Sequence, residues 1–395
     1  MASKNPTPLL APPKKPTSLL ARYRQLSASA AVFVSPLCLG NMTFGTQYAA
    51  VLGECSKETA FEMLDHFVDQ GGNFIDTANS YHAGQTETWL GEWMTARGIR
   101  DQIVLATKYT GPHRTTDPDI KIRVNYGGNG IKSLRLTLED SLKRLQTDYI
   151  DILYLHWWNF TATIPEVMHG LNDLVVSGKV LYLGISDSPA WLVAKANQYA
   201  RDHGLRPFVV YQGMWNAAMR DMEREIVPMC RDEGMGITAY SVLNSGRFQT
   251  EASFQEREET KTGRQQFAVT ARDKQVSKVL ESIAVAKDTT ITNVALAYIL
   301  HKEPYVFPVV GGRKISHIEG NIEGLSTSLT TEEIDKLDRA YDFDPGFPST
   351  FLSGTVVNLG TPQKAASRAS EVRWTTFQGT IDWVEGPKPI RSPPS

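Results

Sequence analysis

Four polar side chains stand at or just after the ends of short apolar segments, where they could act together in a proton transfer. Asp76 closes Asn-Phe-Ile-Asp, Lys108 closes Val-Leu-Ala-Thr-Lys, His156 closes Ile-Leu-Tyr-Leu-His, and Tyr81 follows Asp76 by five residues. A free tyrosine, with a pKa near ~10, is a slow acid at neutral pH. A nearby ammonium would make the phenol a better proton donor, and a carboxylate would keep that ammonium charged.

Such a group of side chains suits the protonation of a carbonyl oxygen, with the imidazole orienting the substrate. None of the four can itself deliver two electrons, so this chemistry requires a hydride cofactor. Taken singly, an aspartate or lysine at a strand end is also a common cap or rim residue. The combination of four complementary groups on neighbouring segments favours catalysis.

The elements that must position these residues alternate between short β-rich apolar segments and longer amphipathic segments, as in repeated βα units. Strands are expected at 34–40, 73–78, 103–108, 150–156, 180–186, 208–212, 236–241 and 305–310. Helices are expected at 57–70, 87–97, 132–145, 165–177, 189–203, 222–233, 276–286 with 292–301, and from 318 onward. Glycines that can take a left-handed conformation follow several of these helices, at positions 71, 98, 178, 204 and 234.

Eight alternations without a GxGxxG turn predict an α/β fold, a (β/α)8 TIM barrel in a single domain. The active site of such a barrel lies at the carboxyl ends of its strands, so the barrel would bring the four polar groups together. Two long connections, 109–130 and 243–273, are expected to be functional loops at that face.

The chain divides into an arm, a barrel and a tail. Residues 1–21, rich in proline, are expected to form a flexible arm, residues 22–342 the barrel, and residues 343–395 a C-terminal tail. The tail carries several aromatic residues and is expected to fold across the barrel mouth. An oligomerisation segment and partial disorder are the alternatives for the tail, and the oligomeric state is left open.

The composition of the chain limits its expected binding partners and its cellular location. The chain has 395 residues, a formal charge of −2 and 21% charged residues, so neither nucleic acid nor membrane is expected as a partner. Cys38, Cys55 and Cys230 are odd in number and far apart, which predicts reduced thiols and no metal site. No apolar run approaches the ~18 residues of a membrane span and no signal-peptide core is present, which predicts a cytoplasmic location. A basic transit peptide is the alternative, opposed by the prolines.

Longer motifs give the chain a close resemblance to the aldo-keto reductases over residues 22–350. The matching stretches are Gly72-Asn-Phe-Ile-Asp-Thr-Ala-Asn-Ser-Tyr81, Thr107-Lys108, Leu155-His156, Gly184-Ile-Ser-Asp187, Tyr211-Gln212 and Ala239-Tyr-Ser241. The resemblance implies that Tyr81 is the general acid and that Asp76, Lys108 and His156 complete a catalytic tetrad. Within the family, His156-Trp-Trp158 and Gly311-Gly-Arg-Lys-Ile315 resemble the fungal aryl-alcohol dehydrogenase and norsolorinic acid reductase branch.

The same resemblance implies the residues that hold the cofactor. Ser186, Asp187 and Gln212 would bind the nicotinamide carboxamide, and Tyr240 would stack on the ring, although Gln212 and Tyr240 could simply end buried strands. The segment after the seventh strand would hold the pyrophosphate through Ser241, Leu243, Ser245, Gly246 and Arg247.

The adenosine end of the cofactor is expected after the eighth strand. Glycine lets a backbone approach phosphate closely, and a helix N-terminus favours negative charge. Two adjacent cations there suggest a phosphorylated ribose and thus NADP(H) rather than NAD(H), although a solvated basic pair is the alternative. The residues expected at this end are Gly311, Gly312, Arg313, Lys314, His317 and Asn321.

The expected function is an NADPH-dependent reductase of aromatic aldehydes or ketones, running in reverse as an aryl-alcohol dehydrogenase. The fungal resemblance suggests a role in secondary metabolism. Phe44, Tyr48, Trp157 and Trp158 are expected to line a pocket for a flat aromatic substrate, although aromatic residues there could also be core. One alternative is a cofactor-binding regulatory subunit with little turnover, like the potassium-channel β subunits. Another is a metal-dependent hydrolase built on Asp76, His82 and His156.

Overall fold

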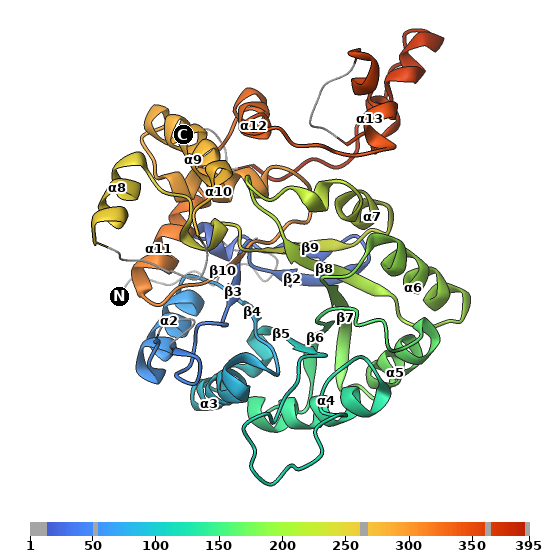
Figure 1. Cartoon of the computed structure of the whole chain (residues 1–395). Coiled ribbons are helices and arrows are strands. Elements are labelled where there is room, and N and C mark those ends of the chain that lie inside the picture. Colours follow the sequence, from blue (N-terminus) through green and yellow to red (C-terminus); the bar gives the residue numbers. More distant parts are fainter. Residues whose placement is uncertain (1–13, 50–53, 261–267, 360–364, 392–395) are drawn as a thin grey trace, which may run out of the picture.

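Eight parallel strands surround the centre of the molecule in the computed structural model, which describes residues 14–49, 54–260, 268–359 and 365–391 (Figure 1). Their order in the sheet is β10-β3-β4-β5-β6-β7-β8-β9. The strands are β3 Cys38–Gly40, β4 Phe74–Asp76, β5 Val104–Tyr109, β6 Ile150–Leu155, β7 Val180–Ser186, β8 Phe208–Met214, β9 Gly236–Tyr240 and β10 Val309–Val310.

The sheet closes into a barrel at two junctions. Val309 of β10 pairs with Cys38 of β3 in parallel register. Between β9 and the segment leading into β10, the amide of Ile237 donates to Tyr305 O at 2.9 Å, and the amide of Phe307 donates to Ile237 O at 2.8 Å. The (β/α)8 TIM barrel predicted from the alternation is therefore confirmed.

Helices alternate with the strands and surround them, as the view along the barrel shows (Figure 1). The helices are α2 Lys57–Asp69, α3 Gln85–Arg97, α4 Ile131–Leu145, α5 Ile164–Val176, α6 Ala190–Asp202, α7 Ile226–Asp232, α8 Glu251–Thr260, α9 Ala271–Ala286, α10 Ile291–Leu300, α11 Ile315–Gly324, α12 Thr331–Asp338 and α13 Ser349–Leu352. The five glycines expected after helices all have a positive φ, as at Gly98 with 61°. Helix α8 lies inside the connection 243–273, where no helix was predicted, and α11 begins three residues earlier than expected.

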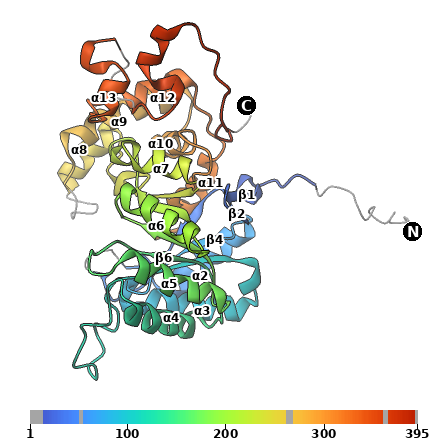
Figure 2. The same cartoon turned by 90° about the vertical axis from the view of Figure 1, so that its right-hand side faces the viewer.

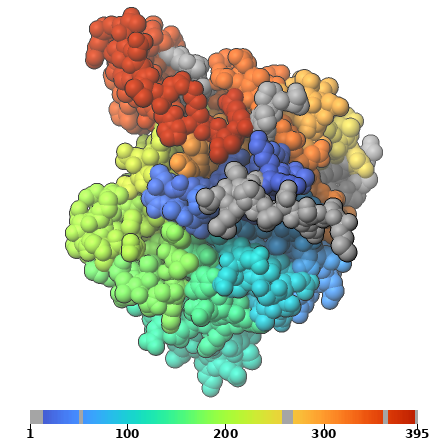
Figure 3. Space-filling view, turned by 180° about the vertical axis from the view of Figure 1, so that it is seen from behind, coloured from blue at the N-terminus to red at the C-terminus, as the bar shows by residue number. Residues whose placement is uncertain are grey.

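An antiparallel hairpin that the sequence did not predict closes the amino-terminal end of the barrel. It consists of β1 Arg24–Ser27 and β2 Ala30–Val34, and the blue N-terminal segment lies across the back face in Figure 3. Leu26, Ala30 and Val34 are buried against side chains at the strand starts, among them Phe74. The strand expected at 34–40 thus begins only at Cys38, because Val34 belongs to the hairpin.

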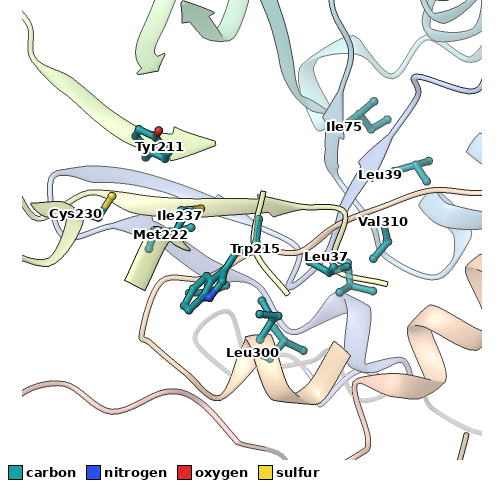
Figure 4. Close-up of a cluster of buried hydrophobic side chains, with 14 of the residues drawn as sticks. Leu37, Leu39, Ile75, Tyr211, Trp215, Met222, Cys230, Ile237, Leu300 and Val310 are labelled. Atoms are coloured by element: carbon teal, nitrogen blue, oxygen red, sulfur yellow. The ribbon is translucent and has the colours of Figure 1, made fainter. Parts of the chain in front are cut away.

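The main core lies between the barrel and its helices. Figure 4 shows Leu37 beside Val310, with Leu39 and Ile75 above them and Leu300 below, and Trp215 beside Ile237 in the same cluster. Leu20, placed within the arm by the sequence analysis, is also fully buried in this core. Residues 1–13 of the predicted arm lie outside the described residues.

The described part of the C-terminal tail packs on one side and on the back of the barrel (Figures 2 and 3). Arg368 forms an ion pair with Glu303 at 3.2 Å, and the guanidinium of Arg391 donates to Leu329 O at 3.1 Å. Glu303 precedes β10, so this contact lies toward the amino-terminal end of the strands. Closure of the mouth by the tail stays a prediction.

Among the described residues, no single helix is long and apolar enough to cross a membrane, and only the bent pair formed by α9 and α10 passes that test together.

Candidate active site

The predicted tetrad assembles at the carboxyl ends of β4, β5 and β6. The ammonium of Lys108, which is fully buried, donates to Asp76 Oδ2 at 2.6 Å and to the carbonyl oxygen of Thr77 at 2.7 Å. Its third contact is the hydroxyl of Tyr81 at 3.5 Å. One buried cation therefore connects the carboxylate to the phenol.

Tyr81 reaches this position because the chain turns sharply after β4. Its amide donates to Ala78 O at 3.2 Å, and the following residues His82 and Ala83 are left-handed, with φ of 47° and 58°. The ring of Tyr81 meets the ring of His156 edge-on, with centroids 6.1 Å apart. The phenol thus lies between Lys108 and the imidazole.

Electrostatics set the protonation state of each group. Burial raises the pKa of Tyr81, and the nearby ammonium of Lys108 opposes that rise. Burial by itself would lower the pKa of Lys108, but attraction to Asp76 and Tyr81 outweighs it, so this pKa is raised and the amine stays charged. Burial, assisted by Lys108, lowers the pKa of His156 to about 3, so its imidazole is neutral at physiological pH.

Polar groups around the tetrad hold both carboxylate oxygens of Asp76, and one nitrogen of His156 is buried without a partner among the described residues. The amide of Gln212, at the end of β8, donates to Asp76 Oδ1 at 2.9 Å, so both carboxylate oxygens are engaged. Within the described chain, the buried Nδ1 of His156 has no hydrogen-bond partner. The site can therefore protonate one oxygen through Tyr81 and offer a neutral imidazole to the same atom.

The residues expected at the nicotinamide lie on the adjoining strands. Ser186 ends β7 and is buried, and Asp187 follows with φ 39°. The hydroxyl of Tyr240, at the end of β9, donates to Asp187 Oδ2 at 3.1 Å. Burial raises the pKa of Asp187, and this hydrogen bond opposes the rise.

The loop expected at the pyrophosphate makes a compact turn after β9. Ser241 and Ser245 have positive φ values, 56° and 53°, and their hydroxyls are 3.0 Å apart. Gly246 is left-handed and has open space where a Cβ would lie. The guanidinium of Arg247 donates to Asn244 O at 3.1 Å and lies 3.8 Å from Asp273, which holds it beside the turn that Leu243 opens.

The residues expected at the adenosine end follow β10. Gly311 and Gly312 lead into Arg313 and Lys314, both exposed, and Lys314 is the N-terminal cap residue of α11. The amide of Arg313 donates to His317 Nδ1 at 3.3 Å, while Asn321 is buried one turn further along the helix. The structure thus places two cations at the amino-terminal end of a helix.

The four aromatic residues expected to line the substrate pocket separate into two pairs. Trp157 is 37% exposed and its ring centroid lies 4.8 Å from that of His156. Tyr48 is 38% exposed and stacks on His82. Phe44 is buried in the main core, and Trp158 lines a groove of about 710 Å³ along α6 and the start of α5. Of the four, only Trp157 has a described ring contact with a tetrad residue.

Sequence reasoning missed two groups that hold the site. The carbonyl of Thr77 binds Lys108, and a backbone oxygen leaves no signal in a sequence. The buried side chain of Asn129 binds the loop that follows β6, and its place in the stretch Gly-Gly-Asn-Gly gave only a turn signal.

The metal site considered as an alternative has no support from the geometry. Asp76 is occupied by Lys108 and Gln212, and His82 Nδ1 accepts a hydrogen bond from the amide of Tyr48 at 3.1 Å. In the part of the chain that the structure describes, no cluster of three or more histidine, cysteine or acidic residues could hold a metal ion.

Comparison with known proteins gives the same family as the resemblance noted in the sequence motifs. The family model for the aldo/keto reductases matches residues 36–342. Norsolorinic acid reductase B of Aspergillus parasiticus is 59% identical over 95% of this chain and 98% of its own length. Norsolorinic acid reductase B of Dothistroma septosporum is 59% identical over 93% and 94%, and an aryl-alcohol dehydrogenase of Pestalotiopsis microspora is 49% identical over 96% of each chain. This chain therefore belongs to the aldo/keto reductase family and is an oxidoreductase.

Proposed function

We propose that this chain reduces an aromatic aldehyde or ketone with NADPH, and oxidises the corresponding aryl alcohol in reverse, with Tyr81 as the proton donor. The observation that carries the proposal is the buried ammonium of Lys108, held between Asp76 and the hydroxyl of Tyr81. A phenol in contact with a buried cation is stabilised as the phenolate that remains after it gives up its proton. The ammonium of Lys108 therefore helps Tyr81 to act as a general acid.

The chain's own residues would handle the proton while a bound NADPH supplies the hydride to the carbonyl carbon. Tyr81 donates its hydroxyl proton to the carbonyl oxygen, and Lys108 stabilises the phenolate. Asp76 and the carbonyl of Thr77 hold Lys108 in place. The neutral imidazole of His156 orients the substrate oxygen, since its low pKa keeps it from competing with Tyr81 as an acid.

The residues around the strand ends fit a nicotinamide cofactor. Asp187 and Ser186 offer polar partners for a primary amide next to the ring of Tyr240, and the open, left-handed turn at Gly246 leaves room for a phosphate. The preference for NADPH over NADH rests on Arg313 and Lys314, two exposed cations at the start of α11, where an extra phosphate would be favoured.

The aromatic substrate class rests on the site and on the relatives. Trp157 and Tyr48 present partly exposed rings beside His156 and His82. The similar proteins are named for norsolorinic acid and for aryl alcohols, which supports an aromatic carbonyl compound and a role in fungal secondary metabolism. The three described cysteines are free and buried, in keeping with a cytoplasmic protein.

The proposal is tested by following NADPH consumption with norsolorinic acid and a panel of aromatic aldehydes and ketones. Turnover is expected to fall by about 10²–10⁴-fold in Tyr81→Phe, the usual contribution of a general acid. Tyr23→Phe, at an exposed tyrosine, is the matched control and should leave turnover unchanged. Normal turnover by Tyr81→Phe would refute the acid role, and tight NADPH binding without turnover of any substrate would favour a regulatory subunit.

A further inference from the structure

The long connection between β5 and α4 ends in Asn129, a side chain that is 1% exposed and bonded on several sides. We propose that Asn129 is a positioning residue that fixes Trp157 beside His156 and thereby sets the preference for large, flat aromatic substrates. This inference rests on the proposed function.

Asn129 holds the backbone on both sides of Trp158. Its amide nitrogen donates to the carbonyl oxygen of Trp157 at 3.1 Å, and its amide oxygen accepts from the backbone nitrogen of Asn159 at 2.7 Å. The same nitrogen also donates to the hydroxyl of Thr110 at 2.9 Å. One buried side chain therefore determines where the segment after His156 runs.

Asn129 is itself held firmly by the connection to which it belongs. The amide of Gly128 donates to Thr110 O at 2.8 Å, and the side chain of Asn79 donates to Gly111 O at 2.9 Å. Farther along the connection, the guanidinium of Arg114 donates to Asp140 of α4 at 2.6 Å. Because these hydrogen bonds fix both ends of the connection, the side chain of Asn129 has a fixed position and holds the backbone of Trp157 in one place.

Asn129 would affect the substrate indirectly, by placing the ring of Trp157. Its ring lies against His156, and the ring of His156 in turn meets Tyr81. From the other side, the backbone nitrogen of Trp158 donates to the hydroxyl of Ser188 at 3.1 Å. Without Asn129, the backbone on both sides of Trp158 would lose the hydrogen bonds at Trp157 O and Asn159 N, and Trp157 could turn away from the imidazole.

The main experiment compares substrates of different size. In Asn129→Leu, which keeps the branched shape of the side chain but replaces its polar atoms with methyl groups, kcat/KM for a fused-ring aromatic aldehyde such as 9-anthraldehyde should fall by about tenfold relative to butanal. A loss of folded protein would lower both values equally. Thr110→Val is the matched control, since it removes one partner of Asn129 and leaves the bond to Trp157 intact.

A double-mutant cycle shows whether the effect passes through Trp157. In the background Trp157→Ala, the change Asn129→Leu should alter the ratio of the two kcat/KM values by less than about twofold. An unchanged ratio in Asn129→Leu itself, or a full effect that persists in Trp157→Ala, would overturn the proposal.

Hydrogen exchange of the peptide covering residues 157–163 gives a readout that needs no turnover. Exchange at the amide of Asn159 should be faster in Asn129→Leu and slow in Asn129→Asp, because a carboxylate still accepts its hydrogen bond. Exchange that is equally slow in both variants would contradict the positioning role. If the wild type reduces no carbonyl compound but exchange changes as expected, the proposed function fails and the positioning of the segment stands. If Asn129→Leu does not fold, Asn129→Ser carries the same expectations.

Discussion

At the ends of β4, β5 and β6 the ionisable groups are buried or partly buried and contact one another, whereas after β10 two cations lie exposed at the start of a helix. We call the first group, Asp76, Tyr81, Lys108 and His156, the catalytic side. The second group, Gly311 to His317, is the cofactor side. Lys108 makes three contacts within the protein, while the side chains of Arg313 and Lys314 are exposed to solvent.

This difference matches the roles that we propose for the two sides. Proton transfer needs groups that are already in place and protected from water, because their geometry and pKa values decide the rate. Binding a charged cofactor needs cations that are free to leave water and meet an anion. Changes on the catalytic side should therefore affect both chemistry and stability, and changes on the cofactor side should affect cofactor binding alone.

The largest expected effect comes from Lys108→Met on the catalytic side. The change leaves Asp76 buried without its cation, so the free energy of unfolding should fall by about 3–5 kcal/mol. Turnover should fall by about 10²–10⁴-fold, because Tyr81 loses the charge that stabilises its phenolate. Urea unfolding and the NADPH assay measure the two losses.

Lys57→Met is the matched control for this prediction. Lys57 pairs with Glu92 at 2.5 Å, but its side chain is 40% exposed, so the free energy of unfolding should change by no more than about 1 kcal/mol. Equal losses of stability in the two variants would show that burial does not distinguish the ion pair of Lys108.

A smaller effect is expected from Arg313→Gln combined with Lys314→Gln on the cofactor side. The KM for NADPH should rise by about 10–100-fold, and the rise should shrink at high salt because the cations are exposed. The KM for NADH and the urea midpoint should stay nearly constant. Lys179→Gln, an exposed lysine before β7, is the control. Equal changes for both cofactors would remove the argument for NADPH.

The contrast between the two sides also explains what the sequence could predict. Strand ends are local features, so Asp76, Lys108 and His156 could be placed from apolar runs that β4, β5 and β6 confirm within two residues. The barrel followed from eight such alternations. The hairpin of β1 and β2 was missed because its burial depends on Phe74 and other distant residues that a local pattern does not contain.

Other differences between the predictions and the structure also have physical causes. Helix α8 lies in a polar stretch without a clear apolar face, so periodicity gave no signal for it. The strand expected at 305–310 is reduced to Val309–Val310, because the chain turns at Tyr305 with φ 56°. The role of Asn129 depends on contacts with Thr110 and the segment after β6, which only the folded chain brings together.

The smallest expected effect is on the pH dependence of stability. It should differ between His156 on the catalytic side and His317 on the cofactor side. His156 has a pKa of about 3 in the folded chain, lowered by burial and by Lys108, against about 6.5 when unfolded. Between these values the unfolded chain binds a proton that the folded chain does not, so stability falls as pH decreases from 6.5 toward 3. The loss amounts to about 2 kcal/mol between pH 7 and pH 5 for this one residue.

His156→Gln should remove that contribution, and urea unfolding at pH 7 and pH 5 measures it. His317, on the cofactor side, also has a lowered pKa, through partial loss of hydration and the charges of Lys314 and Arg313, but its side chain is more exposed than that of His156. His317→Gln should therefore change the pH dependence much less. The lowered pKa of His301, about 4, adds to the slope equally in both variants, so it cancels from the comparison. If His317→Gln flattened the slope as much as His156→Gln, burial would not be what distinguishes the catalytic side from the cofactor side.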